Sequence, residues 1–258
     1  MPEGDTIRYA ASRMRPLLEG RVPDQIRTPQ PRHALDAWPR RLSGRAVERV
    51  DTHGKHLLLR FEGGLALHSH LRMTGSWRVY AAGQPWRRAA SSAWLVLVAD
   101  GHEVVQFDGP VLELLTDGRT RLDRRLAMLG PDVLAEHFDS TRFLKRLRAD
   151  DPTRGIGDAL LDQSTVAGIG NIWKAEGCWE AGVDPWRPLA ELTDAEAIEI
   201  LRRLRPRMLR SAELGPRSIE PRVHGRAGRP CPRCATPIAA RGQGDENRTT
   251  FWCPGCQS

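Results

Sequence analysis

The stretch THGKHLLLRFEGGLALHSH, residues 52–70, predicts an antiparallel hairpin. Its two apolar runs are bounded by the turn signals THGK and EGG, and both are short enough to be strands. Similar runs lie on either side: AVERV at 46–50, WRVY at 77–80, AWLVLV at 93–98 and EVVQF at 103–107. Many short strands joined by turns are typical of a β-sandwich. A helix should pack on it, because one helical face collects Ile7, Ala10, Met14, Leu17 and Leu18.

Helical patterns replace strand patterns after about residue 120. STRFLKRLR at 140–148 predicts a short helix. The segment 193–215 begins with a capping box of Thr193 and Glu196 and should kink or stop near Pro206. We therefore expect an α+β fold with an N-terminal sandwich domain at 1–122, a helical domain at 123–222 and a C-terminal hairpin at 223–258.

Composition excludes some classes of protein. The longest apolar run, AWLVLVA at 93–99, is far too short to span a membrane. Glu3 and Asp5 lie where a secretory signal carries no acid, so we expect a cytoplasmic protein. A net charge of +7 and a pI near 9.7 favour a polyanionic partner, nucleic acid before membrane. A genome that favours arginine codons would give the same charge.

Four cysteines form two C-x2-C pairs near the C-terminus. CPRC holds Cys231 and Cys234, and CPGC holds Cys253 and Cys256. Two such pairs across a hairpin suit a closed, structural four-thiolate zinc site. Disulfides are the alternative, which a cytoplasmic location disfavours. Cys178 should be an ordinary buried residue.

The segment ALLDQSTVAGIGNIWKAEGCWEAG, residues 159–182, predicts two helical stretches around a glycine-bearing turn. The second should begin at Asn171 and end at Gly182. A helix N-terminus behind Gly168 and Gly170 offers backbone N–H groups which, with the Asn171 amide, can bind a phosphate. A plain helical hairpin capped by Asn171 explains the same residues.

Lysine usage points to one turn. Only Lys55, Lys145 and Lys174 are lysines among 39 basic residues, and only lysine has an amine that can transfer a proton. Lys145 and Lys174 fall on predicted helix surfaces. Lys55, in the turn between two strands, is better placed to reach a cleft, although an ordinary turn lysine fits as well.

The chain begins Met-Pro-Glu, and removal of Met1 would leave Pro2 with a free amine. An α-amino group has a pKa near 8, so roughly a tenth of it is unprotonated at pH 7. Such an amine can attack an aldehyde-like carbon and form an iminium, with Glu3 beside it as a general acid. The structural alternative makes Pro2 the start of a helix and Glu3 a partner of its dipole.

Taken together, these motifs resemble the bacterial Fpg/Nei DNA glycosylases. The resemblance covers nearly the whole chain in order, through MPEGDT, THGKHLLLRF, SHLRMTGSW, LGPDVL, LLDQSTVAGIGNIW and CPRC…RTTFWCPGCQ. It implies a β-sandwich, a helix-two-turn-helix domain and a zinc finger, with damaged duplex DNA bound across the cleft between the domains. It also implies a monomeric base-excision enzyme that acts on the bacterial nucleoid and carries one structural zinc.

The resemblance also assigns roles. Pro2 matches the nucleophile that attacks C1′ of the damaged nucleotide, and Glu3 matches the acid that assists sugar-ring opening. Lys55 matches a lysine that contacts phosphate and supports β-elimination. Asn171 matches a phosphate-binding asparagine, and Arg248 matches a finger arginine that grips the flanking phosphates and is linked to δ-elimination.

A flipped base leaves a gap in the duplex that a protein side chain can fill. The resemblance assigns this to the loop Arg72-Met73-Thr74, with Met73 as the wedge; strand alternation would alternatively make Met73 a core residue. QFDGPVLELL at 106–115 lacks the arginine–phenylalanine pair of the oxidised-purine branch, and the stretch 213–231 is short. Oxidised pyrimidines are therefore the expected lesions, 8-oxoguanine and ring-opened purines the alternative. A non-catalytic zinc-finger DNA-binding protein is a third hypothesis.

Overall fold

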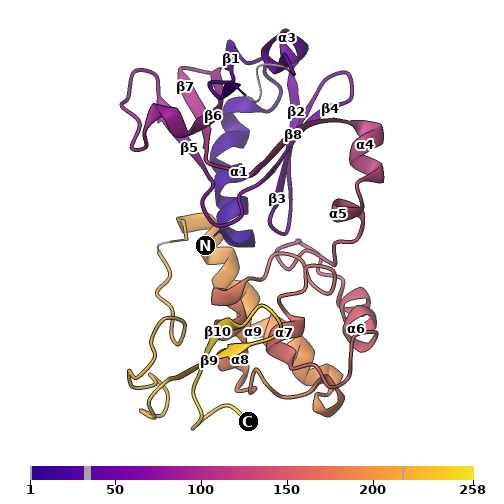
Figure 1. Ribbon diagram of the computed structural model, residues 1–258, viewed down its shortest axis with the longest axis vertical. Coiled ribbons are helices and arrows are strands. Elements are labelled where there is room, and N and C mark those ends of the chain that lie inside the picture. Colours follow the sequence, from indigo (N-terminus) through magenta and orange to yellow (C-terminus); the bar gives the residue numbers. More distant parts are fainter. Residues whose placement is uncertain (1, 32–35, 217) are drawn as a thin grey trace. The chain divides into compact units, whose positions relative to one another are not determined.

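The computed structural model describes residues 2–31, 36–216 and 218–258, and its contacts divide the chain into two compact units. Unit 1 contains Pro2 and Thr6–Ala127, and unit 2 contains Glu3–Asp5 and Met128–Ser258. Strands dominate unit 1, and helices dominate unit 2 (Figure 1). Glu3–Asp5, close to the start of the chain, thus belong by their contacts to the C-terminal unit.

Unit 1 contains two four-stranded antiparallel sheets, which confirms the predicted sandwich. One has the order β1-β6-β7-β5 and the other β2-β3-β4-β8. The strands are β1 Gln25–Arg27, β2 Val47–His53, β3 His56–Phe61, β4 Leu65–His70, β5 Ser76–Ala81, β6 Ala93–Ala99, β7 His102–Phe107 and β8 Val111–Thr116. The predicted hairpin of residues 52–70 is β3–β4, with His56 paired to His70 and Phe61 paired to Leu65.

The core of unit 1 lies between the sheets and the helix α1, Gly4–Leu18. Ile7, Ala10, Met14 and Leu18 of the predicted helical face belong to the same apolar cluster as residues of both sheets. Shorter helical elements complete the unit: α3 Trp38–Leu42, η1 Ala90–Ser92, α4 Asp117–Leu122 and α5 Arg124–Ala127.

Unit 2 is helical and ends in a hairpin. Its elements are α6 Ser140–Arg148, α7 Ile156–Ala159, α8 Asn171–Ala181, η2 Leu189–Glu191, α9 Asp194–Leu214, β9 Ala239–Gln243 and β10 Arg248–Trp252. The predicted capping box at Thr193 and Glu196 is present, and Gly182 ends α8 with φ +75° as predicted. Within the described ranges, no helix is long and apolar enough to cross a membrane.

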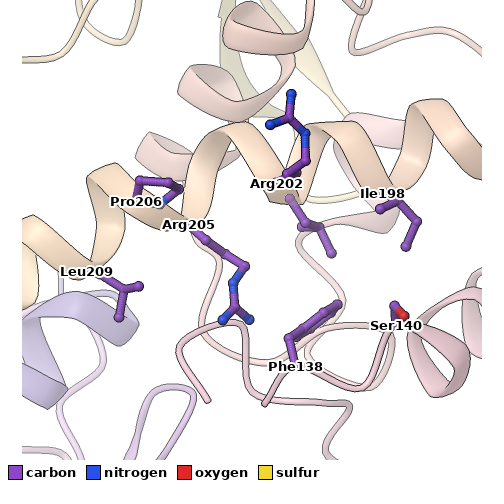
Figure 2. A pocket seen from close by; sticks show the side chains of 8 residues that line it. Phe138, Ser140, Ile198, Arg202, Arg205, Pro206 and Leu209 are labelled. Carbon is purple, nitrogen blue, oxygen red and sulfur yellow. The ribbon is translucent and has the colours of Figure 1, made fainter. Parts of the chain in front are cut away.

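Pro206 does not stop α9, contrary to one of the outcomes that the sequence suggested. The helix continues for eight more residues to Leu214. A proline removes one helical hydrogen bond, but the apolar face of Leu201, Leu204 and Met208 is buried on both sides of it. A pocket of about 270 Å³ lies beside this part of α9, and Figure 2 shows the side chains that line it. None of the predicted site residues lines it.

A buried carboxylate ties the segment after α9 to α8. Glu176, only 1% exposed, accepts hydrogen bonds from the backbone N–H groups of Arg222 (2.8 Å), Val223 (2.9 Å) and His224 (3.0 Å). It also accepts one from Arg207 Nη1 at 2.8 Å. Every donor therefore meets a charged acceptor in a dry environment, where such bonds are strong.

Glu176→Gln is expected to lower the free energy of unfolding by about 1.5–3 kcal/mol, because one side of an amide cannot accept hydrogen bonds. Glu180→Gln is the matched control. Glu180 contacts the same guanidinium at 3.1 Å but is partly exposed, so its loss should cost less than about 1 kcal/mol. Urea unfolding of both variants measures the difference, and equal losses would contradict this account.

Candidate active site

Glu3 occupies the N-terminus of α8. Its side chain is fully buried. Its carboxylate accepts hydrogen bonds from the backbone N–H groups of Gly170 (2.8 Å), Ile172 (2.9 Å) and Trp173 (3.3 Å). The first N–H groups of a helix have no partner within the helix and attract anions. At this helix end, the N–H groups of Gly170, Ile172 and Trp173 therefore bind the Glu3 carboxylate, and the phosphate contact of Asn171 stays a prediction.

Gly170 is required for this contact. A Cβ atom on residue 170 would lie 2.4 Å from the Glu3 carboxyl carbon. The neighbouring residues of the N-terminal stretch are fixed as well, since Gly4 N donates to Gly168 O at 2.9 Å and Ser211 Oγ donates to Asp5 Oδ2 at 2.5 Å. Three consecutive residues behind Pro2 are thus held by unit 2.

Pro2 lies ahead of any helix. α1 begins at Gly4, so Pro2 is not its first residue and Glu3 is not in its first turn. Pro2 and Glu3 thus lie directly before α1 and not within it. What Glu3 does instead is bind the N-terminus of another helix 167 residues later in the chain.

The predicted DNA-contacting residues of unit 1 lie in two turns. Lys55 is half-buried in the two-residue turn between β2 and β3, where Gly54 has φ +55°. Arg72 and Met73 lie in the turn between β4 and β5. Arg72 has φ +49°, and Met73 is 64% exposed. Met73 is therefore not a sandwich core residue, and its side chain is accessible to a ligand.

His70 belongs with these residues, although sequence reasoning did not single it out. Its Nδ1 accepts a hydrogen bond from Arg72 N at 3.2 Å. Burial, followed by the positive charges of Arg72 and Lys55, lowers the pKa of His70 to about 4. A neutral His70 with Nδ1 as acceptor carries its proton on Nε2, and can donate it to an anion. Its position directly before the Arg72 turn was the available signal.

Behind His70 the same sheet carries a chain of polar side chains. His56 Nδ1 lies 2.8 Å from His68 Nε2, and His68 Nδ1 lies 3.3 Å from Glu113 Oε2. Burial, followed by the charges of neighbouring histidines, lowers the pKa of His56 to about 3. His68, Glu113 and Asp123 lie close enough together to ligate a metal. Arg125, however, bridges Glu113 and Asp123, so a guanidinium already supplies the positive charge there.

The four cysteines of the two C-x2-C pairs converge, as predicted. All four Sγ atoms lie within 4.8 Å of one another. Cys231 and Cys256 are 3.8 Å apart, and Cys234 and Cys253 are 3.3 Å apart. Zinc–sulfur bonds of about 2.3 Å place tetrahedral sulfurs roughly 3.8 Å apart, so the arrangement fits a metal. Cys178 is fully buried away from this group, and burial raises its pKa to about 12.

The hairpin β9–β10 lies between these cysteine pairs and presents Arg248 at the start of β10. Arg248 is partly exposed and forms an ion pair with Glu246. Asn171, 8% exposed, donates from Nδ2 to Thr249 O at 2.8 Å. The residue after Arg248 is therefore attached to the first residue of α8, so that Asn171 and Arg248 lie in one connected part of unit 2.

Two family models match the chain. The formamidopyrimidine-DNA glycosylase N-terminal domain matches residues 1–111, and the formamidopyrimidine-DNA glycosylase H2TH domain matches residues 129–222. Similar curated proteins include "Probable endonuclease 8 2" of Streptomyces coelicolor, which is 43% identical and covers 100% of this chain and 94% of its own length. "DNA-(apurinic or apyrimidinic site) lyase Nei2" of Mycolicibacterium smegmatis is 36% identical over 100% and 99% of the two chains.

The formamidopyrimidine-DNA glycosylase of Thermus thermophilus is 34% identical over 100% of this chain and 98% of its own. Among solved structures, Lactococcus lactis Fpg in complex with DNA containing an abasic site has a TM-score of 0.84 at 24% identity, with both chains fully covered. That likeness supports the two-domain α+β fold with antiparallel sheets, and the cysteine cluster is seen in this chain itself. The two domain models and the full-length relatives show that the chain belongs to the Fpg/Nei family of DNA glycosylases, with endonuclease 8-like proteins among its relatives.

Proposed function

We propose that this protein is a base-excision DNA glycosylase and abasic-site lyase that removes oxidised pyrimidines. The observation that carries the proposal is the Glu3 carboxylate, buried and held by three backbone N–H groups directly behind Pro2. A fully buried carboxylate is rare unless it is paired. Here the pairing fixes the stretch of chain that would carry a nucleophilic terminal amine.

The chemistry uses that amine. With Met1 removed, the Pro2 nitrogen attacks C1′ of the damaged nucleotide, a C–N bond forms, and the bond from C1′ to the base breaks. The proton that the Pro2 nitrogen loses on forming this bond passes to the Glu3 carboxylate, and the departing base takes a proton from water. Glu3 then protonates the ring oxygen, which opens the sugar and leaves an iminium. Loss of a C2′ proton then expels the 3′ phosphate, and a second elimination expels the 5′ phosphate. Lys55 supports the first elimination and Arg248 the second, and water finally releases Pro2 from the sugar.

DNA binding involves residues of both units. Arg248 and Asn171 contact phosphates, and Arg72 lies in the same turn as the wedge Met73, which enters the gap that a flipped base leaves. Zinc, one per chain, is bound by Cys231, Cys234, Cys253 and Cys256, and it stabilises the hairpin that carries Arg248. The exposed Met73 side chain and the convergence of the four cysteines support these assignments.

Two observations favour oxidised pyrimidines. Phe107, the aromatic residue in the stretch where the purine branch has an intruding pair, is fully buried at the end of β7 and cannot reach a DNA strand. Four of the similar proteins carry endonuclease 8 or Nei2 names. The 34% identity to a formamidopyrimidine-DNA glycosylase keeps oxidised purines as the second candidate.

Borohydride trapping on an abasic-site duplex tests the enzymatic proposal. The expected result is a covalent protein–DNA adduct with purified protein whose intact mass shows that Met1 has been lost. A matched protein with an uncleaved extension before Pro2 should give no adduct, since an amide nitrogen is not nucleophilic. Absence of an adduct with the trimmed protein would favour a non-catalytic DNA-binding protein.

Lesion preference is tested on matched duplexes that contain thymine glycol or 8-oxoguanine. Under single-turnover conditions we expect faster cleavage at thymine glycol. Faster cleavage at 8-oxoguanine would be consistent with the proposed glycosylase and lyase chemistry but would reject oxidised pyrimidines as the preferred lesions.

A further inference from the structure

Lys174 is buried, contrary to the surface position that the helical pattern predicted. It lies on α8, three residues after Asn171, and its side chain has 0% exposure. An ammonium group loses its hydration on burial, which is unfavourable unless protein groups replace the water. A buried lysine in a chain with only three lysines therefore requires a reason.

The hydrogen-bond partners of Lys174 lie on the two strands of the finger hairpin, β9 and β10. Lys174 Nζ donates to Thr250 Oγ1 and, at 3.3 Å, to Gln243 Oε1. Gln243 and Thr250 lie on β9 and β10 and are themselves nearly or fully buried. Thr250 Oγ1 donates to Gln243 Oε1 at 2.9 Å, and Gln243 Nε2 donates to Pro185 O at 2.7 Å. The lysine thus joins α8 to both strands of the hairpin.

Asn171 and Lys174 form hydrogen bonds to consecutive residues of β10. They are three apart on α8, so they lie on the same face of the helix. Asn171 contacts Thr249 and Lys174 contacts Thr250. Arg248 is the residue directly before this pair. Its main chain is therefore fixed relative to Asn171 through two contacts that are one helical turn apart.

We propose that Lys174 is a positioning residue that locks β10 on α8 and supplies a buried positive charge beneath Asn171 and Arg248, where a DNA phosphate binds. The inference rests on the proposed function, since that function provides the phosphate. A methionine could fill the same space without any desolvation cost. The lysine differs from it in two ways, through its hydrogen bonds and through its charge.

The charge of Lys174 depends on pH. Burial, helped by the charge of Arg248 and opposed by Cys178, Asp158 and Glu3, lowers the pKa of Lys174 to about 8. The nearby His224 is also affected by Lys174, and burial lowers the pKa of His224. A bound phosphate adds negative charge and raises the pKa of Lys174 in the complex. DNA binding is therefore favoured below pH 8 and weakens as the pH rises through that value.

Protein stability has the opposite pH dependence. The unfolded chain has a lysine pKa near 10.4, so between about pH 8 and 10 the unfolded state binds more protons than the folded state. The contribution of Lys174 to the free energy of unfolding therefore rises with pH in this window. A fall in DNA affinity above pH 8 does not then reflect unfolding around Lys174.

Binding of a duplex with a tetrahydrofuran abasic analogue tests the proposal, because this analogue has no C1′ hydroxyl and cannot form an iminium. For the full-length wild-type protein we expect affinity to fall several-fold between pH 7.5 and 9.5. Lys174→Met should bind several-fold more weakly at pH 7 and show no further decrease over this range. Lys145→Met, at an exposed position on α6, is the control and should keep the wild-type profile.

Two further variants separate charge from packing. Lys174→Arg stays charged throughout, and should restore binding at pH 7 without a decrease above pH 8. Thr250→Val removes the hydroxyl but keeps Lys174, so it should weaken binding while retaining the pH dependence. If the Lys174→Met or Lys174→Arg protein lacks its metal or melts at a lower temperature, the proposal is tested by the pH profiles of DNA affinity of Thr250→Val and of the wild-type protein.

A Lys174→Met protein with wild-type affinity and wild-type pH profile would overturn the proposal. So would a wild-type affinity that is flat between pH 7.5 and 9.5. Failure of the underlying function has a different signature, because the wild-type protein would then neither bind the analogue duplex nor give a borohydride adduct.

Discussion

Glu3→Gln is expected to lower the single-turnover rate of base excision by about 10²–10⁴-fold, the usual contribution of a positioned general acid. The amide has the same shape as the carboxyl group but cannot give a proton to the sugar ring oxygen. A preformed abasic site needs this proton less, because its sugar already opens to an aldehyde in water. Borohydride trapping on an abasic duplex should therefore decrease far less than excision of thymine glycol.

The contacts of Glu3 make a control necessary. Its Oε1 accepts from Ile172 N, and its Oε2 accepts from Gly170 N and Trp173 N, so an amide group turns an N–H toward at least one donor. Asp5→Asn disturbs the same stretch, where Asp5 is 3% exposed and bound to Ser211, without touching the proposed chemistry. It should lower the melting temperature without changing the ratio of excision to trapping. Equal loss of excision and trapping in both variants would make Glu3 a structural residue only.

The local sequence pattern was sufficient to predict most of the secondary structure. β3, β4 and α6 have the predicted bounds because each combines a short apolar pattern with a clear turn or cap. β8 was not predicted as a strand, and its partner explains why. VLELLT at 111–116 pairs with β4, so that Leu65 lies opposite Thr116. No signal within the segment indicates a partner some 50 residues away.

The same limit applies to the site. Residue types and spacing identified Pro2, Lys55 and the four cysteines, because terminal amines, turn lysines and C-x2-C pairs carry their chemistry locally. The partners of Glu3 and Lys174 are distant: Gly170 and Thr250 lie 167 and 76 residues away. Helical periodicity predicted a surface position for Lys174, because a local pattern cannot show that the β9–β10 hairpin covers this face of α8. The predicted domain boundaries and the assigned roles of the site residues remain predictions.

Removal of zinc is expected to unfold the finger while leaving both larger cores intact. The apolar cluster of the finger is small, and two of its six buried members, Cys231 and Cys253, are ligands themselves. Structural zinc contributes roughly 10–16 kcal/mol to the folding of isolated fingers, more than so few apolar side chains can replace. Hydrogen exchange should lose protection in β9 and β10 and keep it in β3 and β4.

This unfolding should also abolish tight DNA binding, because Arg248 and the contacts of Asn171 and Lys174 to β10 are lost together. Metal analysis of the purified protein should find one zinc per chain. Cys253→Ser should lower that content and the DNA affinity, and Cys178→Ser, at a buried cysteine outside the cluster, should change neither. A disulfide-bonded finger behaves in the opposite way: a reductant would unfold it, and a chelator would not. Protection in β9 and β10 that survives chelation but not reduction would therefore reject the zinc site.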